Sequence, residues 1–156
     1  MRRLALSLTI GGVNATLYSG PINYIPLVDA GSYWLIPLTD IKIGGVSTGV
    51  NFPSTIIDTG TSLIGMPRAA VEAIYSRIPG SAPFGAQGLY SFPCTASVSL
   101  SFTFGGIEYP MRSTDFNNGA TSSSGRTCVG AIFALESQGG RDLVIVGDAF
   151  LKNVYK

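Results

Sequence analysis

Glycine and proline interrupt this chain at short intervals, which limits how long any regular element can be. The sequence contains 20 glycines and 9 prolines among its 156 residues. The runs between these breaks are rich in β-branched and aromatic residues, which is typical of strands joined by tight turns. We therefore predict an all-β fold of ordinary single-domain size.

Several segments stand out as strands. Strict alternation of apolar and polar residues over Ser97–Phe104 predicts a strand with one buried face. The Gly-Gly pair that follows predicts a tight turn into a second strand over Ile107–Met111. Further strands are predicted over Trp34–Ile43, Tyr24–Pro26 and Val129–Leu135.

Two other segments predict helices. Pro67–Ile78 carries four apolar side chains at helical spacing, with Pro67 suited to the first turn and Pro79 to the end. A short second helix is predicted from Asp148, whose side chain we expect to cap the free backbone amides of its first turn. Asn117–Arg126 is polar and rich in Gly and Ser, which is typical of a mobile surface loop.

Charge and composition exclude several functions. The formal net charge of +1 gives no electrostatic argument for a nucleic-acid or anionic membrane partner. The absence of histidine rules out a Ser-His-Asp triad, a Cys-His pair and a histidine-ligated zinc site within this chain. No uninterrupted apolar run is long enough to span a bilayer. Hydrolytic chemistry here must use carboxylates, and we expect neither a metal nor an organic cofactor.

Three features bear on the cellular compartment. Asn14-Ala15-Thr16 is an N-glycosylation sequon, although such triplets often arise by chance. The apolar run Leu4–Ile10 resembles a signal peptide but is short, so we interpret it as a strand. Cys94 and Cys128 are either two buried thiols or a disulfide, and the signs of secretion favour the disulfide. We expect a secreted, vacuolar or lysosomal protein.

The run Ile56–Ser62, with the sequence IIDTGTS, presents one carboxylate in a context suited to chemistry. Its two isoleucines are predicted to end a buried strand that delivers Asp58 to a glycine turn. Gly60 allows the backbone to approach the carboxylate, so that amide groups can donate to it. Thr61 and Ser62 supply hydroxyls nearby. A carboxylate surrounded by donors in this way can activate water, but it needs a partner.

A second apolar strand complements the first. Leu143–Val146 ends at Gly147, directly before the predicted short helix. We expect Ile145, Val146 and Gly147 to pack beneath the Asp58 loop and to fix its position.

Together these motifs resemble the pepsin-like aspartic proteases. The matching residues are Ile56–Ser62, Ile145–Leu151, Leu8–Gly12, Tyr18–Gly20, Tyr33-Trp34 and the pair Cys94 and Cys128. They occur in the family's order and cover nearly the whole chain from about Leu8. The resemblance implies that residues 1–156 form the C-terminal lobe of a two-lobed β fold, with one clear helix and a short second one, and that the two cysteines form its disulfide.

The resemblance also implies a role for each residue of the loop. Asp58 would be the second catalytic aspartate, and Thr59 would bond across to its counterpart on the other lobe. Gly60 and Thr61 would line the carboxylate and the substrate backbone. Ile56 would lie near a substrate side-chain pocket.

The sequence also departs from the family pattern. Asp-Thr-Gly occurs once, whereas the family has a first such loop and a tyrosine-bearing flap in an N-terminal lobe, and further strands after the short helix. The family's mechanism needs two carboxylates that share one proton. We therefore predict one lobe of an acid-active endopeptidase that cuts extended peptides with apolar side chains, its partner being the missing N-terminal lobe.

Two alternatives stay open. In the first, the chain is an inert or peptide-binding lobe. In the second, two copies of Asp58 meet across a two-fold axis in a homodimer. Separated from its partner, the lobe would expose an apolar inter-lobe face, and we expect non-native dimerisation through that face.

Overall fold

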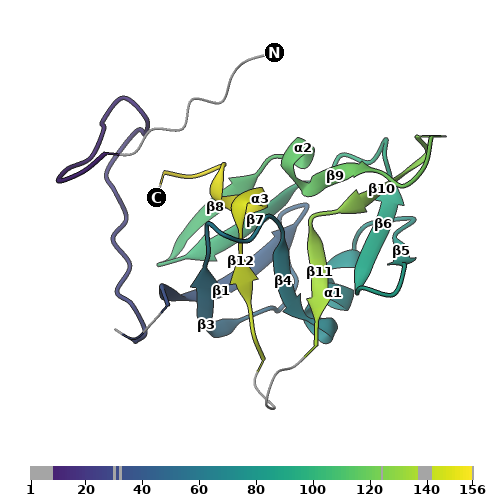
Figure 1. The fold of residues 1–156 in the computed structure, drawn as a ribbon, viewed down its shortest axis with the longest axis horizontal. Helices are drawn as coiled ribbons and strands as arrows, with labels where there is room; N and C mark the ends of the chain where they lie inside the picture. The colour runs from purple at the N-terminus through teal and green to yellow at the C-terminus, as the bar shows by residue number, and fades with distance from the viewer. Residues whose placement is uncertain (1–8, 30, 32, 124, 137–141, 156) are drawn as a thin grey trace.

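The computed structural model describes residues 9–29, 31, 33–123, 125–136 and 142–155. Within these residues two β-sheets and three short helices make up the fold (Figure 1). The structure is mostly β, which confirms the predicted fold class. No helix in the described part of the chain has both the length and the apolar character needed to cross a membrane.

The larger sheet has the strand order β11-β4-β12-β3-β1-β7-β8, with β2 beside β1. Its strands are β1 (Leu35–Ile43), β2 (Val46–Ser47), β3 (Phe52–Ile57), β4 (Ile64–Pro67), β7 (Leu100–Phe104), β8 (Ile107–Met111), β11 (Ile132–Leu135) and β12 (Ile145–Val146). The smaller sheet has the order β5-β6-β10-β9 and lies on the right-hand side of Figure 1. Its strands are β5 (Ala82–Phe84), β6 (Leu89–Pro93), β9 (Asn117–Ala120) and β10 (Thr127–Gly130). The helices are α1 (Arg68–Tyr75), α2 (Ser113–Phe116) and α3 (Asp148–Leu151).

The predicted hairpin is confirmed as the antiparallel pair β7 and β8. Its turn glycines have positive φ angles, 55° at Gly105 and 77° at Gly106, which is the conformation a two-residue hairpin turn requires. The first strand begins at Leu100 rather than at Ser97. Ser101, predicted to be on the polar face, is 7% exposed, and its hydroxyl donates to Glu108 Oε1 at 2.6 Å. That bond allows a polar side chain to lie in a buried position.

Helix α1 is shorter than predicted, covering Arg68–Tyr75 instead of Pro67–Ile78. Pro67 is its N-cap residue and also ends β4, so the strand runs directly into the helix. After Tyr75 the hydrogen bonds tighten: Ile78 N–H donates to the Tyr75 carbonyl only three residues earlier. A proline disfavours helical backbone at the residue before it, which explains why the helix ends ahead of Pro79.

The segment Val129–Leu135 is not one strand, because the chain changes sheets at Ala131. Strand β10 pairs with β6 in the smaller sheet, whereas β11 runs parallel to β4 in the larger one. At the junction Ala131 N–H donates to the Phe116 carbonyl at 2.8 Å, and the Ala131 carbonyl accepts from Ile64 N–H at 2.9 Å. Both backbone groups are thus satisfied where the strand breaks.

Two predictions about the remaining chain were wrong. Tyr24–Pro26 forms no strand; the segment is held instead by the Asn23 side chain, which donates to Phe104 O at 3.3 Å and to Tyr109 Oη at 3.0 Å. The predicted loop Asn117–Arg126 begins with β9, an edge strand paired with β10. The strand predicted over Leu4–Ile10 falls mostly outside the described residues, and its last two residues, which are described, belong to no strand.

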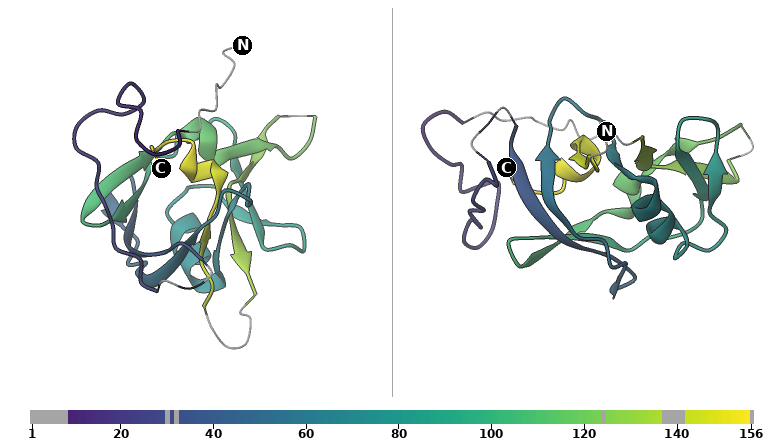
Figure 2. Two further views of the ribbon diagram at one scale, coloured as in Figure 1. Left: turned by 60° about the vertical axis from the view of Figure 1, so that its left-hand side comes forward. Right: turned by 90° about the horizontal axis from the view of Figure 1, so that it is seen from below.

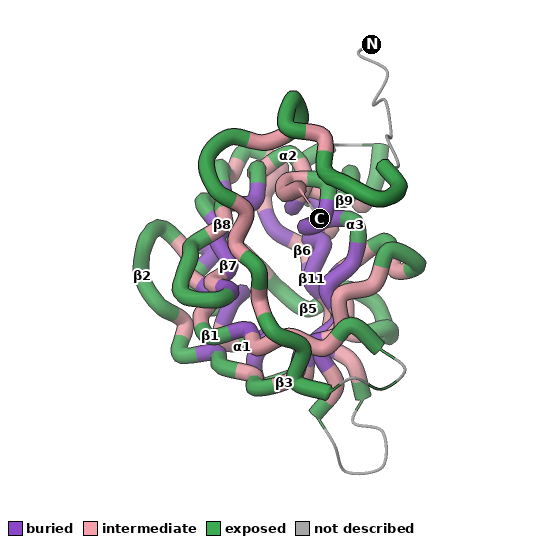
Figure 3. The backbone as a smooth tube through the Cα atoms, turned by 90° about the vertical axis from the view of Figure 1, so that its left-hand side faces the viewer, coloured by how far each residue is buried: buried purple, intermediate pink, exposed green. Residues whose placement is uncertain are grey.

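The core lies between the sheets and the helices, and the two views in Figure 2 show α1 and α3 packed among the strands. Its largest fully buried side chains include Tyr75, Phe92, Phe102 and Phe116. Residues 9–29, ahead of β1, run over one side of the molecule and are mostly exposed (Figure 3).

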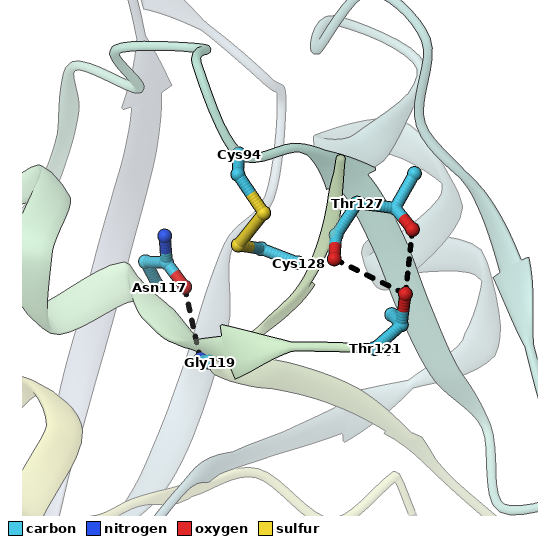
Figure 4. The surroundings of a disulfide bond; sticks show 6 residues. All are labelled: Cys94, Asn117, Gly119, Thr121, Thr127 and Cys128. Atoms are coloured by element: carbon cyan, nitrogen blue, oxygen red, sulfur yellow. Dashed lines mark hydrogen bonds between the residues drawn. A yellow bond between two sulfur atoms is a disulfide. The ribbon is translucent and has the colours of Figure 1, made fainter. Parts of the chain in front are cut away.

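The predicted disulfide is present between Cys94 and Cys128. It joins the residue after β6 to β10, beside Asn117 and Thr121 of the neighbouring segment (Figure 4). The bridge links residues 34 apart. A loop of that length is worth about 3–4 kcal/mol in the chain-entropy model, which places the bridge among the larger single contributions to stability.

Candidate active site

The Asp58 loop connects β3 to β4, and β12 lies between these two strands. Strand β12 is parallel to β3, with Val146 opposite Ile57, and antiparallel to β4, with Val146 also opposite Ile64. Asp58 N–H donates to the Val146 carbonyl at 3.1 Å and so extends the β3 ladder by one residue. Both ends of the loop are therefore fixed to the same central strand.

Helix α3 holds the middle of the loop through its own backbone amides. Gly147 N–H donates to the Leu63 carbonyl at 3.1 Å, Asp148 N–H to the Thr61 carbonyl at 2.8 Å, and Ala149 N–H to the Ser62 carbonyl at 2.9 Å. The first amides of any helix lack partners within the helix and need external acceptors. Here the loop supplies those acceptors, so helix start and loop stabilise each other.

Gly147 is the residue around which this contact is built. A Cβ atom added there would collide with the backbone carbonyl oxygens of Thr61 and Leu63. Gly147 is also the N-cap residue of α3, and Asp148 is the first helical residue rather than the N-cap. Only a residue without a side chain lets the two backbones approach this closely.

The Asp58 carboxylate accepts two hydrogen bonds from its own loop. Thr61 Oγ1 donates to Oδ2 at 2.6 Å, and Gly60 N–H donates to Oδ1 at 2.8 Å. The Thr61 hydroxyl and then the Gly60 amide hold the pKa of Asp58 below its usual value, because both bonds favour the ionised form. A Cβ at Gly60 would lie 3.2 Å from Oδ1, so this glycine also leaves room for the carboxylate.

Among the described residues, the other predicted loop residues make no hydrogen bond to the carboxylate. Thr59 and Ser62 are exposed, and Asp58 itself is half-buried at the surface. Ile56 is half-buried in β3, with its N–H bonded to the Val144 carbonyl at 2.9 Å. Thr59 is therefore free to face another molecule or lobe, while Ser62 contributes through its backbone.

An apolar hollow of about 130 Å³ lies on the flank of β3 beside Ile57. Its lining includes Ile25, Ile36, Ile57, Phe104, Phe150 and Leu151. The sequence did not predict this hollow, since its walls come from five separated segments. Within the described residues no three His, Cys, Asp or Glu side chains are grouped so as to hold a metal ion.

The sequence also did not predict the bonds between α3 and the loop. They join backbone groups, and backbone bonding leaves no residue-type signal beyond the glycine at position 147. That glycine, followed directly by a helix start, was the signal available.

Comparison with known proteins places these features in one family. The family model described as eukaryotic aspartyl protease matches residues 4–156. Aspartic protease of Phaffia rhodozyma is 40% identical over 154 residues, which cover 95% of this chain. Major aspartyl peptidase 1 of Cryptococcus neoformans var. grubii is 40% identical over 93% of this chain, and penicillopepsin-3 of Penicillium janthinellum is 28% identical over 93%.

This chain spans about a third of the length of these relatives. The matched region is 37% of the Phaffia rhodozyma protein, 32% of the Cryptococcus neoformans protein and 36% of penicillopepsin-3.

Proposed function

Because this chain belongs to the eukaryotic aspartyl protease family, we propose that Asp58 is one of two carboxylates that activate water to hydrolyse peptide bonds. The chain contributes the C-terminal lobe of the enzyme, and the second carboxylate lies on an N-terminal lobe. The observation that carries the proposal is the Asp58 loop itself: a half-buried carboxylate with two donors, fixed by backbone bonds to β12 and α3.

The hydrogen bonds to Asp58 suit this chemistry at acid pH. Two carboxyl groups about 3 Å apart cannot both ionise, so the pair shares one proton. The ionised member removes a proton from water, and the protonated member donates to the scissile carbonyl. Thr61 and Gly60 favour a charged Asp58, which supports a singly ionised pair down to low pH. The titration steps belong to the pair and not to Asp58 alone.

The remaining loop residues are assigned by position. Thr59 is exposed next to Asp58 and bonds across to the partner loop in this proposal. Ile56 lies near a substrate pocket, and an extended peptide with apolar side chains is the substrate. Two exposed aromatic residues just ahead of β1, Trp34 at 68% and Tyr33 at 61%, form part of the face that meets the other lobe in this proposal.

The test uses the longer, two-lobed protein and an internally quenched peptide at acid pH. Asp58→Asn should reduce kcat/KM at least about 10²–10⁴-fold, the usual contribution of a general acid or base. Asp29→Asn, which removes an exposed carboxylate elsewhere, is the matched control and should keep activity. Full activity of the Asp58→Asn variant would refute the assignment.

The same assay decides between the alternatives. A two-lobed protein that folds but never cleaves would favour the inert or peptide-binding interpretation. Cleavage by the 156-residue chain alone, with activity rising as the square of its concentration, would favour a homodimer that pairs two copies of Asp58.

We also propose that the protein follows the secretory route, to the outside or to a vacuole or lysosome. The Cys94–Cys128 disulfide supports this, because such bridges persist in oxidising compartments and are rare in the cytosol. Fractionation of the producing cells, with the cysteines assayed by thiol labelling, tests the route independently of activity.

A further inference from the structure

The chain contains a single Asn-X-Ser/Thr triplet, Asn14-Ala15-Thr16, and it lies on the exposed segment ahead of β1. Ala15 and Thr16 are exposed, and Asn14 is half-buried. The neighbouring Val13 and Leu17 are 50% and 52% exposed. A bulky group attached at Asn14 therefore meets solvent rather than packed core.

The triplet adopts a compact turn centred on the Asn14 side chain. Thr16 Oγ1 donates to Asn14 Oδ1 at 2.7 Å, and Thr16 N–H donates to the same oxygen at 3.0 Å. Leu17 N–H closes the turn on the Asn14 carbonyl at 3.1 Å. The side-chain nitrogen Nδ2 makes no hydrogen bond within the part of the chain that the structure describes.

A distant tyrosine fixes the backbone of this turn. Asn14 N–H donates to Tyr155 Oη at 3.0 Å, and the Tyr155 ring lies 4.8 Å from that of Tyr18. This anchor uses the backbone of Asn14 and leaves its side-chain amide available.

We propose that Asn14 is the acceptor of an N-linked oligosaccharide, an inference that depends on the secretory route proposed above. The donor is an oligosaccharide carried on a polyprenyl diphosphate. A bond forms between Nδ2 and the anomeric carbon, the bond from that carbon to the diphosphate oxygen breaks, and the lipid diphosphate leaves with the electron pair. Nδ2 gives up one proton to a base of the transferase.

The Thr16 contacts suit this transfer. Negative charge gathers on Oδ1 as Nδ2 loses its proton, and donors already aimed at that oxygen stabilise the charge. The hydroxyl contributes one of the two donors. A residue at position 16 without a hydroxyl retains only the backbone donor, so the proposal requires Thr or Ser there.

The experiment expresses the full-length protein in a eukaryotic host behind a heterologous secretory leader, so that entry to the pathway does not depend on the native route. Peptide-N-glycosidase treatment in heavy-oxygen water converts a glycosylated Asn14 to labelled Asp, which peptide mass spectrometry locates. This mapping uses the unsubstituted protein and needs no variant to fold.

Variants then test the contacts. Asn14→Gln and Thr16→Ala should abolish the glycosidase-sensitive gel shift, whereas Thr16→Ser should retain it. Asn118→Gln removes an exposed asparagine outside any sequon and is the matched control. A secreted, disulfide-bonded protein with unlabelled Asn14 would overturn the inference. That result would leave the proteolytic proposal intact, since Asp58→Asn tests that proposal separately.

Discussion

Replacing Gly147 by alanine isolates the contact that holds the Asp58 loop. The backbone of Gly147 has φ −103° and ψ −164°, an extended conformation that alanine also adopts. Backbone strain therefore contributes nothing to the effect. What remains is the collision of the new methyl group with the carbonyl oxygens of Thr61 and Leu63.

The structure sets the expected size of the effect. Overpacking costs about 1–3 kcal/mol, and here the obstacle is backbone that cannot rotate away. The methyl group also pushes apart at least one of the bonds that Gly147 and Asp148 donate to the loop, each worth about 0.5–1.5 kcal/mol net. We expect the free energy of unfolding to fall by about 2–5 kcal/mol, a large share of the stability of a typical domain.

Urea unfolding followed by circular dichroism measures this loss as a shift in midpoint. Gly12→Ala is the matched control, because a Cβ at Gly12 meets nothing within 4 Å and its φ is not positive. That variant should stay within about 0.5 kcal/mol of the unsubstituted protein. Equal midpoints for the two variants, with unchanged slopes, would show that the loop does not depend on this close approach.

Three further predictions concern polar groups. Thr55 is fully buried, and its hydroxyl has no hydrogen-bond partner among the described residues. Thr55→Val should therefore raise the free energy of unfolding by about 1–2 kcal/mol, measured by urea unfolding. A loss of stability would instead indicate that the hydroxyl is hydrogen-bonded. Thr61→Val removes the main cause of the lowered Asp58 pKa, so titration of this variant followed by carbon-13 NMR should show a higher Asp58 pKa. Thr61→Ser keeps the hydroxyl and should leave the pKa low. An unchanged pKa in Thr61→Val would contradict the role given to the Thr61 hydroxyl. Lys42 and then the Ser101 hydroxyl hold the pKa of Glu108 below its usual value, so their stabilisation is present above the unfolded-state pKa and is lost as the pH falls through the folded-state pKa. Glu108→Gln should accordingly lower the melting temperature near neutral pH, with the difference vanishing in acid; a pH-independent difference would point to packing instead.

The sequence predicted those parts of the fold that depend on local pattern. The spacing of Val71, Ile74 and Tyr75 identified the face of α1 that is buried. The glycine pair Gly105-Gly106 identified the hairpin, because few residues other than glycine adopt the required φ angles.

Features that depend on distant partners were not predictable in this way. Ala131 sits inside an apolar run, and nothing in that run shows that one half pairs with β6 and the other with β4. Ser101 was predicted to lie on the polar face, because the pattern of its own strand does not show that its partner, Glu108, lies on the next strand. The sequence pattern indicates how side chains alternate along a strand, but it does not indicate which strand lies beside it.

In the candidate site, too, contacts between residues close in sequence were predictable and contacts between distant residues were not. Asp58, Gly60 and Thr61 lie within four residues of one another, so their contacts could be anticipated from the motif. The bonds from the start of α3 to the loop are made by backbone atoms about 85 residues away in sequence, and side-chain chemistry does not reveal them.

Helix α3 has a second surface, and it faces the aromatic core. Phe150 lies 4.7 Å from Phe102 and 5.7 Å from Phe104, measured between ring centroids, and both partners belong to β7. A change of volume in β7 would tilt the helix and displace the amides that hold the Asp58 loop. Repacking this interior strand should therefore alter the pKa of Asp58, so variants selected for a better-packed core can carry a changed ionisation of that carboxylate.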